Sequence, residues 1–348
     1  MLNKKIIIAL LAGATLLVGG SSWAKVSPVE AEKLKGELTP FGGERAGNAD
    51  GTIPAWDGGI KGIPEGSGYK GPGDFHPDPF KDDKVQLSIT GKNIDQYADK
   101  LGKGVAALLK KHPEFRMDIY PTHRTASAPQ NIYDNTFNNA TLIELTADKE
   151  GIVANGGSAG IPFPIPQNGN EAMFNHNLRW RGTGMEGDYA QKNAYANGKL
   201  STGEGGYDVE RFPWYIPNDE TGIYWEILVQ YKEPARRNGE IAMLTDAINL
   251  SETPRKAWQY LPGQRRVRRA PSIAYDTPNP STSGIGNYDD IFVFNGGLDR
   301  YNWKIVGKKE MYIPYNNYAF DLADVKDLMT PLIPNPDFMR WELHRVWE

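Results

Sequence analysis

The chain has 348 residues, no cysteine and a formal net charge of −4. The absence of cysteine excludes disulfides, zinc–thiolate sites and thiol nucleophiles. A mildly acidic chain does not hold nucleic acid or anionic lipid by bulk charge, so we expect no nucleic-acid partner. Its 38 glycines and 25 prolines are spread along the sequence and indicate many turns between short elements, as in a β-rich fold.

The first 24 residues have the pattern of a secretory signal peptide. Lys4 and Lys5 precede an apolar run over 6–18, which is shorter than the roughly 20 residues that span a bilayer. Small residues at Ser22 and Ala24 predict export with cleavage after Ala24. No cysteine follows for lipid attachment, and no later segment is apolar enough to cross a membrane, so we expect a mature chain that is not a lipoprotein.

A short helix is predicted from the capping box at Ser27 to about Leu38. The stretch 38–59, LTPFGGERAGNADGTIPAWDGG, resembles a calcium loop, but Ala46 stands where the first ligand is needed. We therefore expect a turn set by Asn48 and Asp50, and no metal site. Two further helices are expected, one from Asn93 to Pro113 and one from Glu171 to about Arg179.

A nucleophile-elbow pattern, G-x-S-x-G, occurs at 156–160 around Ser158. Prolines at alternate positions after it forbid the helix that such an elbow requires. None of the five histidines lies in an HExxH or HxxEH pattern. We predict no catalytic residue and no cofactor, although a triad assembled in space remains open.

Strands are concentrated in the second half of the chain. Apolar residues alternate through the first expected strand, 223–231, and Pro262-Gly263 marks a tight hairpin between two later strands. Successive antiparallel strands with short turns form a meander, either a sheet or a partly closed barrel. The expected strands cover 223–231, 241–250, 257–261, 265–269, 290–294 and 301–306.

The C-terminal region is expected to hold a helix from about Asp321 to Pro331 and a strand at 341–348. The chain stops inside that strand. An unpaired, aromatic-rich edge strand invites aggregation, so we expect the native protein to continue beyond residue 348.

Three segments resemble the DUF1329 family of exported bacterial proteins: the stretch 38–59, AWQYLPGQRRVRR at 257–269 and PNPSTSGIGNY at 278–288. The similarity covers essentially all of the mature chain. The family is grouped with carriers similar to LolA and LolB. The resemblance implies a single mainly β (α+β) domain over 25–348. Its expected fold is an antiparallel open half-barrel around an apolar cavity, with a few packing helices and long Gly/Pro-rich loops.

The resemblance also implies a periplasmic location and envelope transport of an apolar ligand. Family genes often lie beside a resistance-nodulation-division permease and an outer-membrane protein of the DUF1302 family, which are the implied partners. A non-enzymatic carrier or adaptor for a hydrophobic, lipid-like ligand is the leading hypothesis. The alternatives are an interaction subunit of the permease complex that carries no ligand, and an envelope hydrolase.

Two groups of side chains are candidate binding residues. Aromatic residues near the first central strands either line the cavity or fill an ordinary core. The expected strand 265–269, which we call the basic strand, contains four arginines: Arg265, Arg266, Arg268 and Arg269. They either bind an anionic head group or an acidic partner, or form a solvated face. By strand alternation, Arg266 and Arg268 point to one face, and Arg265 and Arg269 to the other. The aromatic candidates are Trp214, Trp225, Tyr231, Trp258 and Tyr260.

Overall fold

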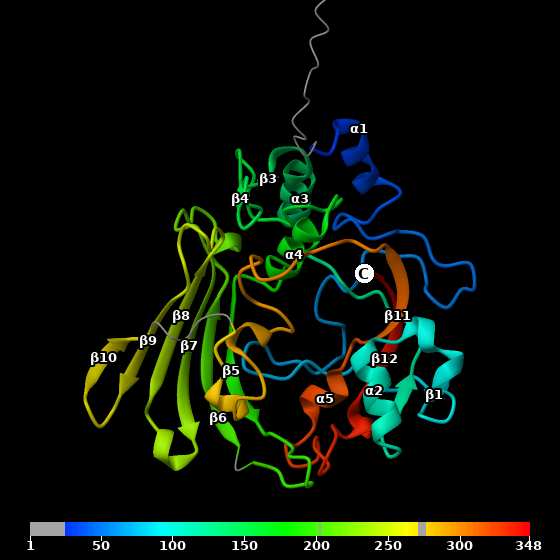
Figure 1. Cartoon of the computed structure of the whole chain (residues 1–348). Helices are drawn as coiled ribbons and strands as arrows, with labels where there is room; N and C mark the ends of the chain where they lie inside the picture. The colour runs from blue at the N-terminus through cyan, green and yellow to red at the C-terminus, as the bar shows by residue number, and fades with distance from the viewer. Residues whose placement is uncertain (1–24, 202, 271–275) are drawn as a thin grey trace, which may run out of the picture.

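The computed structural model describes residues 25–201, 203–270 and 276–348 (Figure 1). The predicted signal peptide at 1–24 lies outside these residues. Two large open sheets and a small one dominate the fold, with few helices. The expectation of a mainly β fold with open antiparallel sheets is therefore confirmed.

The largest sheet is a six-stranded antiparallel meander. Strands 223–231, 241–250, 257–261 and 265–269 of the sequence prediction all belong to it, with bounds shifted by a few residues. The strands Gly184–Gln191 and Glu204–Arg211, which come first in the sequence, were not predicted, because their glycines and charged residues hide the alternation of apolar and polar side chains. In spatial order the strands are β10 (Arg266–Arg269), β9 (Lys256–Leu261), β8 (Ile241–Ala247), β7 (Ile223–Glu233), β6 (Glu204–Arg211) and β5 (Gly184–Gln191).

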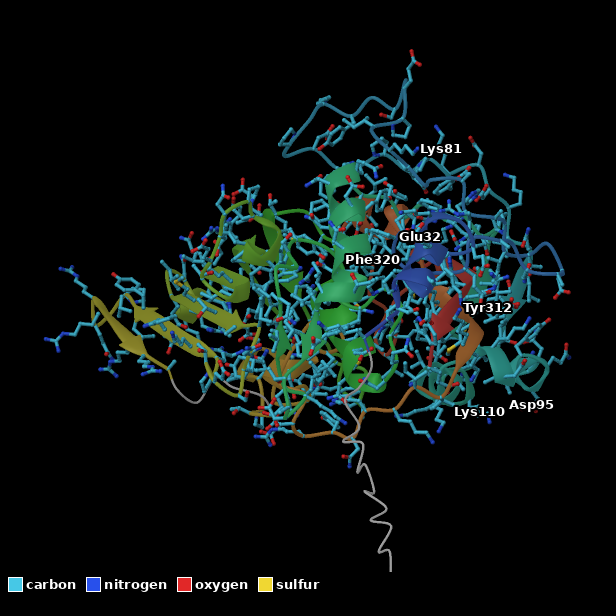
Figure 2. The ribbon with its side chains drawn as sticks, turned by 90° about the horizontal axis from the view of Figure 1, so that it is seen from above. Glu32, Lys81, Asp95, Lys110, Tyr312 and Phe320 are labelled. Atoms are coloured by element: carbon cyan, nitrogen blue, oxygen red, sulfur yellow. The ribbon has the colours of Figure 1, made fainter. Side chains whose placement is uncertain are left out.

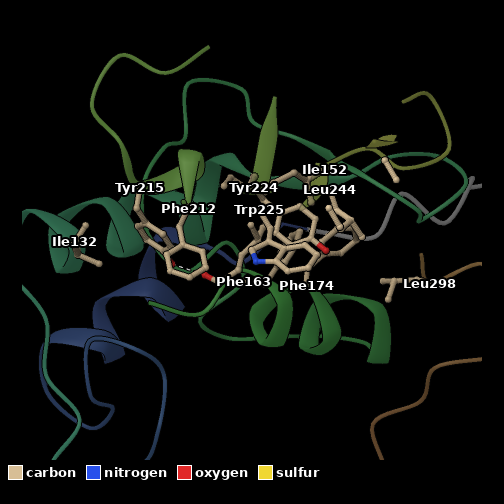
Figure 3. Packing of buried hydrophobic residues seen from close by; sticks show 14 residues of the cluster. Ile132, Ile152, Phe163, Phe174, Phe212, Tyr215, Tyr224, Trp225, Leu244 and Leu298 are labelled. Carbon is tan, nitrogen blue, oxygen red and sulfur yellow. Dashed lines mark hydrogen bonds between the residues drawn. The ribbon is translucent and has the colours of Figure 1, made fainter. Parts of the chain in front are cut away.

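One face of this sheet is covered by two helices, α3 (Gln130–Leu142) and α4 (Gly169–Asn177), and by the segment 288–303. Figure 3 shows the aromatic side chains that fill the space between them. Trp225 is 0% exposed, and its Nε1 donates a hydrogen bond to Glu210 at 2.6 Å. The space left between Phe174, Leu298 and their neighbours measures only about 10 Å³. Around Trp225 the covered face is therefore a packed core, and a hollow of about 390 Å³ lies at its margin beside Ile143 and Phe163.

A second sheet joins chain segments far apart in sequence. The last strand lies inside this sheet: it pairs along its whole length with its antiparallel neighbour and meets another strand in parallel through Trp341 and Ile119. The prediction that this strand is an unpaired edge is wrong. The order is β1 (Leu87–Ile89), β2 (Met117–Ile119), β12 (Trp341–Trp347) and β11 (Lys308–Pro314).

The remaining elements are short. The first predicted helix is present as α1 (Pro28–Ala31), continued by a 3₁₀ turn to Lys35, and Ser27 caps it as expected. The helix predicted from Asn93 is two 3₁₀ turns followed by α2 (Lys103–Lys111), because the chain turns at Gly102. A two-stranded sheet, β3 (Glu144–Leu145) and β4 (Ile152–Val153), follows α3. No described helix is long and apolar enough to cross a membrane.

Three predicted elements near the C-terminus are wrong. The helix expected from Asp321 is α5 (Tyr318–Leu322), and the chain after it forms turns up to Pro331. The strands expected at 290–294 and 301–306 are irregular. Four of their apolar residues, Ile291, Phe292, Phe294 and Trp303, pack against the core as a covering segment, whereas Val293 and Val306 are exposed.

Candidate ligand-binding face

The face of the six-stranded sheet opposite the packed core carries an apolar surface. Because side chains alternate along a strand, the ladder register decides which residues share this face. Leu228 lies opposite Met243, and Met243 lies opposite Trp258. In the next row Ile241, Tyr260 and Val267 are neighbours. We call these six residues on β7 to β10 the apolar face.

The apolar face borders a shallow hollow of about 550 Å³. Val267 is 66% exposed, and Leu228 and Met243 are 38% and 37% exposed. Figures 1 and 2 show β9 and β10 projecting from the body with no described helix beside them. A contiguous exposed surface of large apolar side chains marks a binding site more often than a scattered one does.

Cationic side chains border the apolar face. Arg269 lies opposite Trp258 in the ladder, and Lys256 is two residues from Trp258 on the same strand, so both share its face. Both are exposed, and neither forms an ion pair with the described residues. Arg266 and Arg268 point to the other face of the same strand.

The hairpin turn that joins β9 to β10 carries the fourth arginine. Arg265 has a φ of 50° there. The four arginines are therefore distributed over the turn and both faces of the edge strand, and none forms an ion pair with the described residues.

The five predicted aromatic residues lie on two faces. Trp258 and Tyr260 belong to the apolar face. Trp225 and Tyr231 belong to the opposite, core side, where the guanidinium of Arg237 lies 3.5 Å from the ring centre of Tyr231. Trp214 packs against the same core, and its Nε1 donates to the carbonyl of Gly160 at 2.9 Å. The five aromatic residues therefore do not share one wall: Trp214, Trp225 and Tyr231 pack as core, which was the alternative interpretation, and Trp258 and Tyr260 lie on the apolar face.

The G-x-S-x-G loop is fixed against α3. The amide of Ser158 donates to Asn139 Oδ1 at 3.0 Å, and Asn139 Nδ2 donates to the Ser158 carbonyl at 2.8 Å. A Cβ on Gly160 would lie 2.6 Å from the backbone nitrogen of Thr136, so only glycine fits. The motif is explained by close packing. In the described ranges no group of three acidic or histidine side chains could hold a metal ion.

Sequence reasoning missed a buried charge cluster in β12. Glu342 is 0% exposed and accepts hydrogen bonds from Arg340 Nε at 2.6 Å and from the amide of His123 at 2.9 Å. His344 Nε2 lies 3.0 Å from the second carboxylate oxygen. The alternation of Glu342 and His344 along β12, with Arg340 just before the strand, was the signal, since it places all three on one side.

A family model described as "Protein of unknown function (DUF1329)" matches residues 88–348. The chain belongs to the DUF1329 family. A relative, an uncharacterized protein of Pseudomonas aeruginosa, is 37% identical over 356 residues, which cover 100% of this chain and 76% of the relative.

A crystal structure of a DUF1329 family protein from Desulfovibrio piger also matches, at 20% identity and a TM-score of 0.26. That match covers 37% of this chain and 49% of the other, so it spans about half of the solved chain. The family name assigns no biochemical activity.

Proposed function

We propose that this DUF1329 protein is a non-enzymatic binding protein that takes an amphiphile with an anionic group on the apolar face. One observation carries the proposal. An exposed face of large apolar side chains lies beside Arg269 and Lys256, two exposed cations that form no ion pair within the described chain. The apolar body of the ligand would cover the face, and its anionic group would contact these cations.

The energetics favour such a ligand over a purely polar one. Each CH₂ group removed from water contributes about 0.8 kcal/mol, so a short acyl chain laid along the face supplies most of the affinity. A contact between a carboxylate and an exposed arginine adds less, about 0.2–1 kcal/mol. The cations therefore orient the ligand, and the apolar face determines how tightly it binds.

The proposed role is that of a carrier or adaptor in the bacterial envelope. Export through the predicted signal peptide and a periplasmic location belong to this proposal, as do the permease and the outer-membrane partner implied by the family resemblance. The ligand site differs from the sequence prediction, because it lies on the open face of the sheet and not inside the half-barrel.

Titration calorimetry with dodecanoate and 1-dodecanol tests the proposal. We expect the purified mature protein to bind dodecanoate more tightly than the alcohol. The variant Met243→Glu places a carboxylate on the apolar face and should weaken dodecanoate binding at least ten-fold. Arg269→Gln should weaken it about three-fold and reduce the preference for the acid, since it removes one cation from the same row.

Arg268→Gln is the matched control, because Arg268 lies on the same strand and points to the other face. Its affinity for dodecanoate should equal that of the wild type. Thermal unfolding checks that each variant is folded. The proposal fails if the wild type binds neither probe, or if a folded Met243→Glu protein binds dodecanoate as tightly as the wild type. Equal effects at Arg268 and Arg269 would contradict the assigned face.

A further inference from the structure

A second pocket lies at the other end of the molecule, against β11 and β12. Figures 1 and 2 show these strands on the side away from β9 and β10, with Tyr312 of β11 labelled in Figure 2. The pocket measures about 350 Å³, which is at the lower end of the range of about 300–1,000 Å³ for small-molecule sites. Its walls are mostly apolar and aromatic, and include Phe41, Trp56, Tyr133, Ile313, Tyr315 and Trp347.

The aromatic walls are held in place by hydrogen bonds and ring contacts. Trp56 Nε1 donates to the carbonyl of Ala126 at 3.0 Å. The hydroxyl of Tyr133 accepts a hydrogen bond from the amide of Ala128 at 2.8 Å, and the Phe41 ring meets Tyr133 edge-on, with ring centres 5.1 Å apart. The pocket is therefore preformed, which lowers the entropic cost of binding a ligand.

More positive than negative side chains line this pocket. Three cations, Lys308, Arg345 and Arg124, line it together with one carboxylate, Glu44. Glu44 pairs with Lys308 at 2.9 Å and with Arg345 at 2.9 Å, and Arg345 also pairs with Glu310 at 3.8 Å. Arg124 instead donates to backbone carbonyls, those of Glu44 at 2.6 Å and Arg45 at 3.0 Å. Its charge is therefore not neutralised by a carboxylate in contact.

The surroundings of Arg124 disfavour its charged form. Burial lowers the pKa of Arg124, and the positive charge of Arg345 lowers it further. The hydrogen bond from Lys308 holds the pKa of Glu44 below its ordinary value, so Glu44 is ionised and already engaged. His344 also lines the pocket, and its Nε2 is held by buried Glu342. An anion entering the pocket would compensate the charge of Arg124, since Lys308 and Arg345 already pair with Glu44 and Glu310.

We propose that this pocket binds a small organic monocarboxylate with an aromatic or apolar body. The carboxylate would lie toward Arg124 and His344. The body would pack against the aromatic wall formed by Trp56 and Tyr133, whose rings meet edge-on with centres 6.5 Å apart. The site is separate from the apolar face and does not depend on the function proposed for it.

Titration calorimetry with 2-naphthoate and its neutral analogue 2-naphthamide tests this inference. Because the two probes have the same ring system, their difference measures the contribution of the negative charge. We expect the wild type to bind 2-naphthoate at least ten-fold more tightly than the amide. Val346→Trp fills the pocket from β12 and should abolish binding of both probes.

Arg124→Gln should reduce naphthoate affinity at least ten-fold and remove the preference over the amide. Lys110→Gln is the control, because Lys110 is an exposed lysine on α2, away from the pocket. Lys308→Gln provides a second charge variant if Arg124→Gln fails to fold, and should weaken naphthoate more than the amide. The inference is overturned if the wild type does not distinguish the probes or binds neither. A folded Val346→Trp protein that keeps wild-type affinity would also overturn it.

Discussion

Arg255 holds Asp246 through two hydrogen bonds, from Nε to Oδ1 at 2.7 Å and from Nη2 to Oδ2 at 2.6 Å. The Asp246 side chain is 0% exposed and that of Arg255 is 4% exposed. Asn295 joins the pair, donating to Asp246 at 3.1 Å and accepting from the hydroxyl of Tyr224 at 2.9 Å. This cluster fastens the covering segment 288–303 to the six-stranded sheet.

Asp246→Asn should destabilise the protein by about 3–5 kcal/mol, because it leaves the charge of Arg255 buried without its carboxylate. The free energy of unfolding from urea denaturation measures the change. Asp188→Asn is the matched control, since Asp188 pairs with Lys232 on the surface and its side chain is 75% exposed. That change should cost less than about 1 kcal/mol. Equal losses in the two variants would contradict the structural role given to the buried pair.

The charge on Glu342 should stabilise the protein in a pH-dependent way. Burial alone would raise the pKa of Glu342, but hydrogen bonds from His344, Asn316 and Arg340 more than offset it and hold the pKa below its ordinary value of 4.5. The unfolded chain therefore takes up this proton at a higher pH than the folded chain does. The stabilisation is fully present above about pH 4.5 and is lost as the pH falls through the folded pKa.

Glu342→Gln removes this charge and tests its contribution. At pH 7 the variant should be less stable than the wild type by about 3 kcal/mol. The difference in unfolding free energy between the two proteins should shrink as the pH falls below about 4.5. Urea denaturation at a series of pH values measures it. A difference that stays constant from pH 7 to pH 3 would show that the ionised carboxylate is not the stabilising group.

Gly160→Ala should destabilise the protein by about 1–3 kcal/mol, because the added methyl group would contact the backbone of α3 at Thr136. Thermal unfolding measures the loss. Gly104→Ala in α2 is the control, since a Cβ there meets nothing within 4 Å and alanine favours the helix. Its midpoint should rise slightly. Ser158→Ala should leave stability near that of the wild type, and a large loss in that variant would contradict the packing explanation of the motif.

The sequence predicted the meander from β7 to β10 because it shows alternating apolar residues and a clear hairpin turn. It could not predict α3, whose sequence QNIYDNTFNNATL is rich in asparagine and threonine and has weak helix propensity. Tertiary contacts stabilise this helix, since Thr136 and Asn139 are fully buried against the loop at 158–161. Such contacts are not visible in the local pattern.

The candidate site was predictable only in part. Trp258 and Tyr260 were among the expected ligand residues. The alternation of the basic strand separated Arg269 from Arg266 and Arg268, but only the ladder register shows that Arg269 lies opposite Trp258. The alternation does not predict which face of the sheet is covered by other elements. That depends on α3, α4 and the segment 288–303, which pack on the Trp225 side and leave the Trp258 side open.

The position of β12 has a consequence for the order of folding. Its pairing with β2 joins Trp341 to Ile119, 222 residues apart, and the hydrogen bond from Thr122 to the carbonyl of Leu343 joins residues 221 apart. The four-stranded sheet therefore closes only after the last strand has been synthesised, and loop closure over such a distance is slow. Until then β2 is paired only with β1. A nascent chain can therefore pair the strands of the six-stranded meander before β12 exists, but it cannot complete the four-stranded sheet until synthesis has reached β12.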